Sequence, residues 1–311
     1  MDMKTTFLQK AYFRGAIVDF DKAQVSIATH ALHYGTAAFG GMRVTPDPHQ
    51  PGNVLLFRPE LHAKRLSASA RLLGYELSAE AILDALTQFV AANDGSAPYY
   101  LRPLVYVSDL GIAPRLHDVE HDFLIYGLPM GDYLPATGVR CCISSWMRNE
   151  DRTLPLRGKI AGSYVTSALA KTEAEARGYD EAILLNAAGK VAEASAMNVF
   201  VVRGSQLITP DVSQDILEGI TRRSIIELAG AAGIEVVERP VDKSELLMAD
   251  EVFLSGTAAQ ITPVKEIEQY TLPPQRPITE RLQKSFKQAA AGEDPQFRDW
   301  TVSLPAATKK A

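Results

Sequence analysis

The sequence predicts an α+β protein of two domains. The chain has 311 residues, which is long enough to bury a large core and to divide into two domains. Strand-like alternation and helix-like periodicity occur in both halves. Between the halves, the segment GLPMGDYLPATG (127–138) holds three glycines and two prolines, a composition typical of a linker. We therefore expect a small N-terminal α+β domain over 1–134 and a larger domain over 139–311.

The N-terminal part predicts a hairpin, two helices and two further strands. Residues 11–28 alternate in short bursts around Gly15 and Asp21, which is typical of two antiparallel strands. Apolar residues at helical spacings predict amphipathic helices over 55–74 and 79–93. The segments 99–112 and 121–130 are rich in Tyr, Val, Leu and Ile, which favours strands.

The C-terminal part predicts a sheet with helices around it. Helical patterns cover 164–177, where Gly178 ends the helix, then 221–233 and a short stretch at 243–250. The strand patterns are VRCCISSW (139–146), EAILLN (181–186), VAEASAMNVFVV (191–202) and QLITP (206–210), and EVFLSGTAAQITPV (251–264) indicates a strand that runs into a tight turn.

Charge and cysteine usage limit the partners and the compartment. The net charge is −5 and basic residues are scattered, so no basic face predicts binding to nucleic acid or an anionic membrane. Small molecules or another subunit are the expected partners. The only cysteines, Cys141 and Cys142, are adjacent and form no disulfide framework. No apolar run approaches the ~18 residues of a membrane span, and the N-terminus lacks a signal-peptide core. We therefore expect a soluble, cytoplasmic protein.

One lysine and one acid carry the candidate chemistry. Lys159 lies between two glycines in PLRGKIAGSY (155–164), just before a predicted helix. Glu193 is the only acid in the strand pattern VAEASAMNVFVV. A carboxylate in so apolar a pattern either faces solvent or is paired with a cation.

Two further segments suggest an anion site. LEGITRRSI puts Gly219, Ile220 and Thr221 at a helix N-terminus, and LSGTAAQ puts Thr257 and Ala258 in a tight turn. Backbone N–H groups at such points bind phosphate, although each segment alone also fits an ordinary cap or turn. The chain contains neither GxxxxGK[ST] nor GxGxxG. A lysine, a buried acid and a phosphate cradle together suit pyridoxal phosphate, an aldehyde that forms a Schiff base with lysine.

Six separated segments resemble the branched-chain amino acid aminotransferases, which are class IV aminotransferases of fold type IV. The similarity covers nearly the whole chain and follows the same order. It implies two domains, a small N-terminal one and a larger one with a β-barrel-like sheet surrounded by helices, and it implies homodimers. The segments are THALHYGTAAFGGMR (29–43), YYLRPLVYVSDLG (99–111), SSW followed by GKIAGSYVTSALAKTEA (158–174), the strand with Glu193, DILEGITRRSII (215–226) and ADEVFLSGTAAQITPV (249–264).

This resemblance implies a role for each candidate residue at the cofactor. Lys159 matches the Schiff-base lysine, which also moves the proton during catalysis, and Glu193 matches the partner of the pyridine nitrogen. Tyr164 matches the phenol that hydrogen-bonds the ring oxygen, and Arg58 matches the phosphate-binding arginine. The remaining implied cofactor-binding positions are Leu217, Gly219, Ile220, Thr221 and Thr257.

The same resemblance implies a substrate pocket with two kinds of lining. Arg102 would meet the distal carboxylate of glutamate. The hydroxyl of Tyr100 and the N–H groups of Thr257 and Ala258 would hold the α-carboxylate. The apolar wall would consist of Tyr34, Phe39, Met130, Tyr133 and Tyr164, which without the resemblance fit ordinary core packing.

The implied reaction is transamination of leucine, isoleucine and valine with 2-oxoglutarate. The alternatives on the same fold are a D-amino acid transaminase, an (R)-amine transaminase and an aminodeoxychorismate lyase. Three positions depart from many family members: Gly40 and Met197 stand where an acid is common, and Met130 where a tryptophan is common. They leave the side-chain preference open. His30 and His33 have no cysteine or acid cluster beside them, so no metal site is expected.

Overall fold

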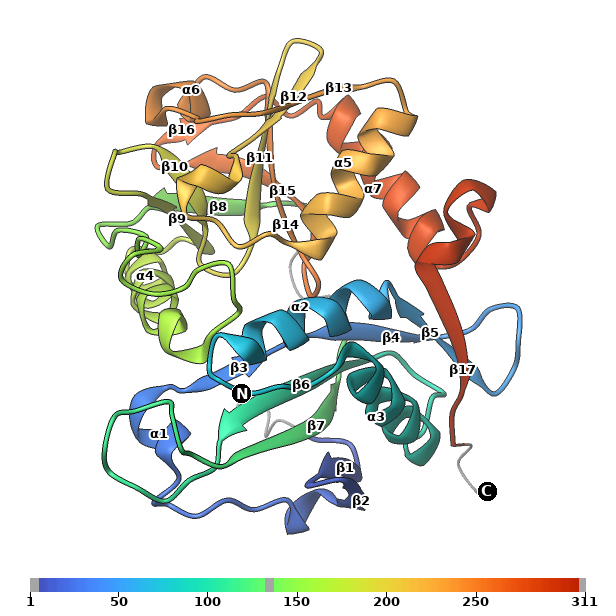
Figure 1. Ribbon diagram of the computed structural model, residues 1–311. Coiled ribbons are helices and arrows are strands. Elements are labelled where there is room, and N and C mark those ends of the chain that lie inside the picture. Colours follow the sequence, from blue (N-terminus) through green and yellow to red (C-terminus); the bar gives the residue numbers. More distant parts are fainter. Residues whose placement is uncertain (1–5, 132–136, 308–311) are drawn as a thin grey trace. The chain divides into compact units, whose positions relative to one another are not determined.

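The computed structural model describes residues 6–131 and 137–307, which form two compact units (Figure 1). Unit 1 consists of Met1–Gly131, Gly158–Gly162 and Ala289–Ala311, and unit 2 of Asp132–Arg157 and Ser163–Gln288. The break after residue 131 falls inside the predicted linker 127–138, where β7 continues to Pro129. The segments 158–162 and 289–311 pack with unit 1, which differs from the predicted division between 1–134 and 139–311.

Unit 1 is built on an antiparallel sheet with the strand order β17-β5-β4-β6-β7-β1-β2, and β3 pairs with β6. Its strands are β1 (Lys10–Phe13), β2 (Ala16–Asp19), β3 (Ala37–Phe39), β4 (Met42–Pro46), β5 (Asn53–Phe57), β6 (Tyr99–Val107), β7 (His121–Pro129) and β17 (Thr301–Pro305). Its helical segments are η1 (Phe20–Lys22), α1 (His30–Tyr34), α2 (Pro59–Arg71), α3 (Ala79–Ala92) and η4 (Pro295–Trp300).

Helices α2 and α3 pack together and cover the core of unit 1. Leu66, Leu86 and Phe89 from these helices join Leu56 and Leu101 of the sheet in one apolar cluster. The Ser78 hydroxyl accepts a hydrogen bond from the N–H of Ala81 at 3.1 Å and caps α3.

The predicted helix over 55–74 begins too early. Residues 55–57 belong to strand β5, which pairs with β4 and with β17, and α2 begins only at Pro59. Proline suits the first helical position because that position lacks an intrahelical partner for its N–H group. The predicted hairpin near residue 15 is confirmed, and Gly15 adopts a φ of 82° in its turn.

Unit 2 contains a mixed sheet with the strand order β10-β9-β8-β15-β14-β11-β12-β13, and β16 pairs with β15. The pairs β8·β9, β8·β15 and β12·β13 are parallel. Its strands are β8 (Val139–Ile143), β9 (Glu181–Leu185), β10 (Val191–Ala194), β11 (Asn198–Arg203), β12 (Gln206–Thr209), β13 (Glu235–Glu238), β14 (Glu251–Gly256), β15 (Gln260–Ile267) and β16 (Tyr270–Thr271).

Helices flank the unit 2 sheet, as the sequence predicts. Helix α4 packs against β9, and α5 packs against β13 and β14. Helix α7 runs beside α5, and Arg281 donates a hydrogen bond to the Ala232 carbonyl at 2.8 Å (Figure 1). The helical segments are α4 (Tyr164–Ala176), η3 (Val212–Gln214), α5 (Ile220–Ala231), α6 (Lys243–Leu247) and α7 (Pro277–Ala290), and the short η2 (Ala161–Ser163) begins in the 158–162 segment of unit 1.

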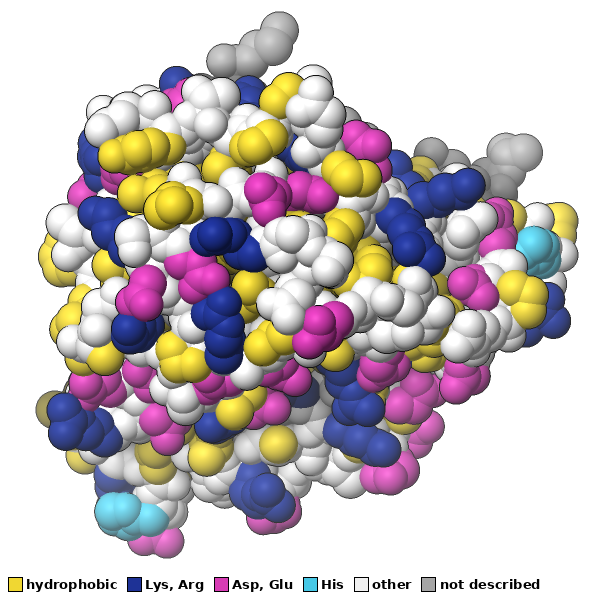
Figure 2. All heavy atoms as spheres, turned by 90° about the horizontal axis from the view of Figure 1, so that it is seen from above, with side chains coloured by type: hydrophobic (Ala, Val, Ile, Leu, Met, Phe, Trp, Pro, Cys, Tyr) yellow, Lys and Arg dark blue, Asp and Glu magenta, His cyan; other side chains and the backbone are white. Residues whose placement is uncertain are grey.

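The charged side chains are intermingled on the surface. On the face in Figure 2, lysine and arginine side chains alternate with aspartate and glutamate side chains. This pattern agrees with the net charge of −5 and the scattered basic residues of the sequence. Among the described residues, no helix has both the length and the apolar character needed to cross a bilayer.

Candidate active site

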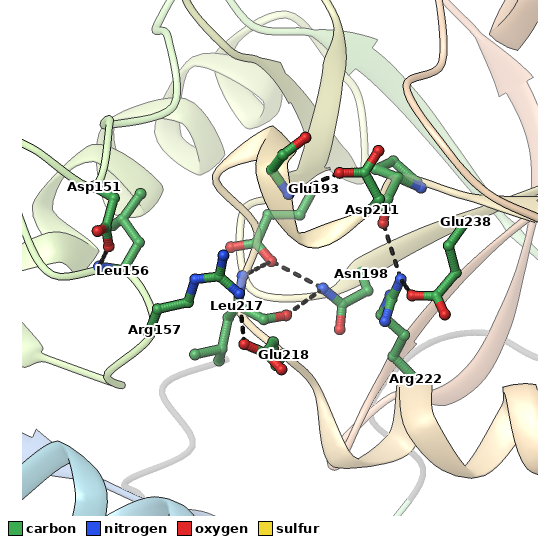
Figure 3. Close-up of polar contacts among 12 residues, drawn as sticks. Asp151, Leu156, Arg157, Glu193, Asn198, Asp211, Leu217, Glu218, Arg222 and Glu238 are labelled. Carbon is green, nitrogen blue, oxygen red and sulfur yellow. Dashed lines mark hydrogen bonds and ion pairs between the residues drawn. The ribbon is translucent and has the colours of Figure 1, made fainter.

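A buried carboxylate forms the polar centre of unit 2. Glu193 is 6% exposed, and its Oε1 pairs with the Arg148 guanidinium at 2.8 Å. Its Oε2 accepts hydrogen bonds from Asn198 Nδ2 at 3.0 Å and from the N–H of Leu217 at 3.1 Å (Figure 3). Of the two sequence alternatives, solvent exposure is therefore wrong and pairing with a cation is right. An opposite charge at this distance offsets much of the cost of burying a carboxylate.

The sheet and two loops position the partners of Glu193. All four residues of β10 are buried, so the strand carries its acid into the interior. Arg148 follows β8, and its Nε donates to the Asp215 carbonyl at 2.9 Å, which orients the guanidinium. Asn198 opens β11, and its Nδ2 also donates to the Leu217 carbonyl at 2.9 Å. Asn198 therefore links the acid-bearing strand to the loop that leads into α5.

The loop before α5 requires a glycine. A Cβ on Gly219 would lie 2.1 Å from Asn198 Oδ1, so no larger residue fits while Asn198 keeps its bonds. Gly219 is the N-cap of α5 and makes no side-chain capping bond, and Ile220 and Thr221 form the first turn. Because the first N–H groups of a helix have no intrahelical acceptors and lie at the positive end of its dipole, this turn suits an anion.

The start of α5 is fixed by a buried arginine. Arg222 is 5% exposed and pairs with Glu238 at 2.6 Å, and it also donates to the Pro210 carbonyl at 3.0 Å (Figure 3). These bonds join the helix to the ends of β12 and β13. The first turn of α5 is thus held in place before any ligand binds.

Two more predicted residues of unit 2 lie at element ends. Thr257 and Ala258 occupy the turn between β14 and β15, which are paired up to Gly256 and Gln260. In front of this turn, the Ser255 hydroxyl is buried and has no hydrogen-bond partner among the described residues. Tyr164 is the first residue of α4 and is half-buried.

The backbone of Lys159 is held by unit 1. Its N–H donates to Ser69 Oγ of α2 at 3.1 Å, and its carbonyl accepts from the N–H of Phe39 at 3.0 Å. Nearby, the N–H of Gly162 donates to the Gly35 carbonyl at 3.0 Å. A Cβ on Gly35 would lie 2.8 Å from the Gly162 Cα, so this close approach needs a glycine at position 35.

Three of the predicted substrate residues contact one another in unit 1, and one of them, Phe39, also lies beside Lys159. The Lys159 ammonium lies 5.0 Å from the ring centroid of Phe39, and the Arg102 guanidinium carbon lies 4.6 Å from the same centroid. Arg102 Nη2 donates to the Tyr100 hydroxyl at 3.3 Å. Phe39, Tyr100 and Arg102 therefore lie close together within this unit, and their roles at the substrate stay predictions.

Arg58 is buried at the start of α2. Its guanidinium carbon lies 3.4 Å from the centroid of the Trp300 ring, and the exposed fraction of Arg58 is 5%. Arg58 has a φ of 48°, a left-handed conformation that is uncommon outside glycine.

The other predicted wall residues are placed differently. Tyr34 is 40% exposed, and its hydroxyl donates to the Ile112 carbonyl while its ring packs against His30. Met130 is half-buried just after β7. Tyr133 lies outside the described residues.

Histidines near the site are engaged in structural contacts or buried. His30 Nδ1 bonds Thr36 Oγ1 at 2.8 Å and its Nε2 bonds the Ala113 carbonyl at 3.0 Å. Within 6–131 and 137–307, no group of three or more His, Cys, Asp or Glu side chains is arranged to hold a metal ion. Burial, with the charges of Arg65 and Lys159, lowers the pKa of His62 well below its ordinary value, so this imidazole is neutral.

Five residues that hold these sites are missing from the sequence-based set: Ser69, Arg148, Asn198, Arg222 and Trp300. Arg148 follows the quoted SSW motif, and Asn198 lies inside the predicted strand 191–202, which the structure divides into β10 and β11. Their partners could not be identified from periodicity, because each contact joins segments that are distant along the chain.

Comparison with known proteins assigns the class. The family model described as "Amino-transferase class IV" matches residues 37–267, and the chain belongs to this family. A probable branched-chain-amino-acid aminotransferase of Synechocystis is 58% identical over 96% of this chain and 98% of its own length.

Solved structures agree with this relationship. The branched-chain aminotransferase of Thermoproteus uzoniensis, solved with norvaline, has a TM-score of 0.91 and is 36% identical, covering 95% of this chain and 99% of its own. The enzyme of Thermobaculum terrenum, solved in its PLP form, has a TM-score of 0.90 and is 36% identical over 96% and 98%. Within the class IV family, the chain groups with the branched-chain aminotransferases. The predicted α+β architecture of fold type IV is confirmed.

Proposed function

We propose that the protein transfers the amino group of L-leucine, L-isoleucine or L-valine to 2-oxoglutarate, giving the branched-chain 2-oxo acid and L-glutamate, with pyridoxal phosphate as cofactor. The names of its relatives support this substrate class. The observation that carries the proposal is the buried Glu193 carboxylate, which is held by Arg148, Asn198 and the Leu217 N–H group. A carboxylate fixed in this way suits a protonated ring nitrogen.

The residues present fit the cofactor's phosphate. The turn at Gly219 leaves no room for a Cβ, and the first turn of α5 lacks a side-chain cap. The Ser255 hydroxyl beside the Thr257 turn is buried without a partner, which is costly unless a ligand supplies one. We assign the phosphate to Arg58, Ile220, Thr221 and Thr257, with Leu217 and Gly219 shaping the loop.

Each side chain then has a defined task in the reaction. When bound, the cofactor supplies an electron sink and carries the amino group from one substrate to the other. The amine of Lys159 would take the proton from the Cα of the amino-acid substrate and deliver it to C4′ of the cofactor, and in the second half-reaction it would move a proton in the opposite direction, to the Cα of the new amino acid. Glu193 would pair with the protonated ring nitrogen, and Arg148 holds the carboxylate in position. The phenol of Tyr164 donates to the ring oxygen.

The substrate side must accept both an aliphatic side chain and a second carboxylate. We assign the aliphatic wall to Phe39, Tyr34, Met130 and Tyr133, and the distal carboxylate of glutamate to Arg102. We assign the α-carboxylate of the substrate to the Tyr100 hydroxyl and to the N–H groups of Thr257 and Ala258.

Gly40 and Met197, which differ from the residues common in the family, belong to the substrate-binding part of the proposal. A Cβ on Gly40 would lie 2.9 Å from Pro103 Cγ, so an acidic side chain there would require the proline ring to shift. Met197 is 5% exposed and belongs to the apolar cluster of unit 2. Both features favour an apolar substrate over a polar one.

The assembly and the compartment are part of the proposal. We infer a homodimer in the cytoplasm, on the basis of the resemblance to the branched-chain enzymes and of the reduced, buried cysteines Cys141 and Cys142. Light scattering after size-exclusion chromatography tests the dimer. A monomeric mass for the active protein contradicts it.

Reductive trapping tests the cofactor and its lysine. Purified protein should be yellow, and borohydride should fix the cofactor to the peptide that contains Lys159. Lys159→Ala should keep the fold and lose about 10²- to 10⁴-fold in turnover, because the amine that moves the proton is gone. Lys64→Ala, an exposed position on α2, is the matched control and should behave as wild type. Colourless protein that takes up no cofactor contradicts the proposal.

A half-reaction panel tests the substrate class. L-leucine, L-isoleucine and L-valine should discharge the bound cofactor's absorbance much faster than L-phenylalanine, D-alanine or (R)-1-phenylethylamine. A preference for D-alanine or the (R)-amine, or release of pyruvate from aminodeoxychorismate, would assign the chain to another reaction of this fold.

A further inference from the structure

The C-terminal strand brings Trp300 opposite Arg58. Strand β17 pairs antiparallel with β5 in a register that places Thr301 against Phe57. One step further in this register, the N–H of Arg58 donates to the Trp300 carbonyl at 2.6 Å. The arginine at the start of α2 is therefore bonded to a segment near the other end of the chain.

The two side chains also stack. The guanidinium carbon of Arg58 lies 3.4 Å from the indole centroid, and the two residues are 5% and 7% exposed. Phe57 meets the indole edge-on with centroids 5.9 Å apart, and Phe297 lies at 4.2 Å. A tryptophan face is the strongest aromatic partner for a cation, and the attraction grows when both groups are removed from water.

The backbone of Arg58 also depends on this contact. Its φ of 48° and ψ of 47° are left-handed, and residues with a Cβ adopt this conformation only when their surroundings hold them there. The carbonyl of Arg58 accepts the first helical hydrogen bond of α2 from the N–H of His62 at 3.2 Å. Backbone and side chain of Arg58 are thus fixed by Trp300 on one side and by α2 on the other.

We propose that Trp300 is a positioning residue that holds the Arg58 guanidinium ready for the cofactor's phosphate. Stacking uses the face of the guanidinium, whereas hydrogen bonds to phosphate use its edge, so the two interactions are compatible. An arginine that is already ordered loses less rotamer freedom when the phosphate binds. This inference rests on the proposed pyridoxal phosphate chemistry and extends it to a residue of the C-terminal segment.

Cofactor titration of the apoprotein tests the role of Trp300. Trp300→Leu keeps the backbone carbonyl and most apolar contact but removes the stack, so it should weaken affinity for pyridoxal phosphate about 10-fold. Affinity for pyridoxal, which lacks the phosphate, should stay at the wild-type value. Trp300→Phe should recover part of the loss. Trp146→Leu, at a 45% exposed position of unit 2, is the matched control and should bind both compounds as wild type does.

The outcomes separate the two proposals. Wild-type protein that binds no pyridoxal phosphate contradicts the proposed function. Wild-type protein that binds it, with Trp300→Leu either unaffected or weakened equally toward both compounds, overturns the positioning role.

Fluorescence gives a second readout if Trp300→Leu does not fold. The chain has two tryptophans, so Trp146→Phe leaves Trp300 as the only indole. Inorganic phosphate added to this apoprotein should shift or quench the Trp300 emission, because the stacked guanidinium changes its hydrogen bonding. Arg58→Met in the same background should abolish the response. An emission that does not change with phosphate overturns the inference.

Discussion

At the scale of single residues, Gly41 and Tyr100 are mutually dependent. A Cβ on Gly41 would lie 1.7 Å from the Tyr100 hydroxyl oxygen, and the position is buried. Gly41→Ala must displace the Tyr100 ring, so we expect the free energy of unfolding to fall by about 1–3 kcal/mol. We also expect the KM for L-leucine to rise, because the Tyr100 hydroxyl is assigned to the α-carboxylate. Urea denaturation and steady-state kinetics measure the two effects.

A second glycine provides the control for this substitution. Gly230 lies in α5, and a Cβ there would meet nothing within 4 Å. Gly230→Ala should therefore stabilise the protein by about 0.5–1 kcal/mol through helix propensity. Gly41→Ala with wild-type stability and KM would contradict the close contact with Tyr100.

His62 makes the stability depend on pH. Burial lowers its pKa well below the ordinary value of 6.5, and the charges of Arg65 and Lys159 lower it further. Below pH 6.5 the unfolded chain binds a proton that the folded protein does not, so acid favours unfolding. The contribution of His62 to the free energy of unfolding is therefore complete above pH 6.5. Below pH 6.5 it decreases by up to about 1.4 kcal/mol per pH unit.

Denaturation curves between pH 5 and 7.5 measure this dependence. His62→Gln should flatten the acid side of the stability profile, because glutamine does not titrate. His49→Gln, at an exposed position, should retain the wild-type slope. If both variants keep the same slope, the lowered pKa of His62 is contradicted.

The sequence identified the chemical groups of the site better than their partners. The resemblance assigned roles to Lys159 and Glu193. The burial and pairing of Glu193 agree with one of the two readings of its apolar pattern, whereas the role of Lys159 stays a prediction. The sequence could predict that Glu193 needs a cation but not which one, since Arg148 reaches it from the loop after β8, which is distant along the chain. The stack of Arg58 on Trp300 depends on strand pairing, which periodicity does not reveal.

At the scale of secondary-structure elements, a buried acid anchors α7. Glu251 is 3% exposed and accepts hydrogen bonds from the N–H of Ile278 at 3.0 Å, the N–H of Thr279 at 2.8 Å and the Thr279 hydroxyl at 2.6 Å. Glu251→Ala leaves these donors without their acceptor, and we expect a loss of about 3 kcal/mol in unfolding free energy.

Thermal and urea unfolding of paired variants test this anchor. Glu280→Ala, an exposed position in the first turn of the same helix, should change the free energy by less than about 0.5 kcal/mol. Equal effects of the two substitutions would show that the first turn of α7 does not depend on Glu251.

Helices and strands were predicted correctly where a single spacing of apolar residues, helical or alternating, runs through the whole segment. Helix α3 and strands β6 and β7 have long, uniform patterns, and the structure contains them close to the expected bounds. The segment 55–74 joins the end of β5 directly to α2, so a continuous apolar pattern concealed a change of structure at Arg58. Helix α7 and strand β17 were not predicted; β17 is a short edge strand, and its pairing partner lies far away in the sequence.

At the scale of the whole molecule, unit 1 is assembled from three separate pieces of chain. Gly158–Gly162 brings Lys159 to β3, and Ala289–Ala311 brings β17 to β5. Along the sequence, the last piece of unit 1 therefore comes after all of unit 2. This interleaving explains why a single linker near residue 131 does not divide the sequence into two consecutive domains.

The C-terminal piece should accordingly be essential for unit 1. A chain that ends at Gln288 lacks the five residues of β17, the buried Trp300, and Leu304 and Ala306, which pack against the unit 1 core. The lost apolar burial and the exposed edge of β5 should remove at least about 5 kcal/mol, a large share of a typical domain's stability. We expect loss of cooperative unfolding and aggregation through the open sheet edge. A chain that ends at Ala307 loses no described residue and should unfold as wild type does, as followed by circular dichroism and light scattering. If the chain that ends at Gln288 keeps the wild-type transition, the C-terminal piece is an accessory to unit 1, and its pairing with β5 contributes little to the fold.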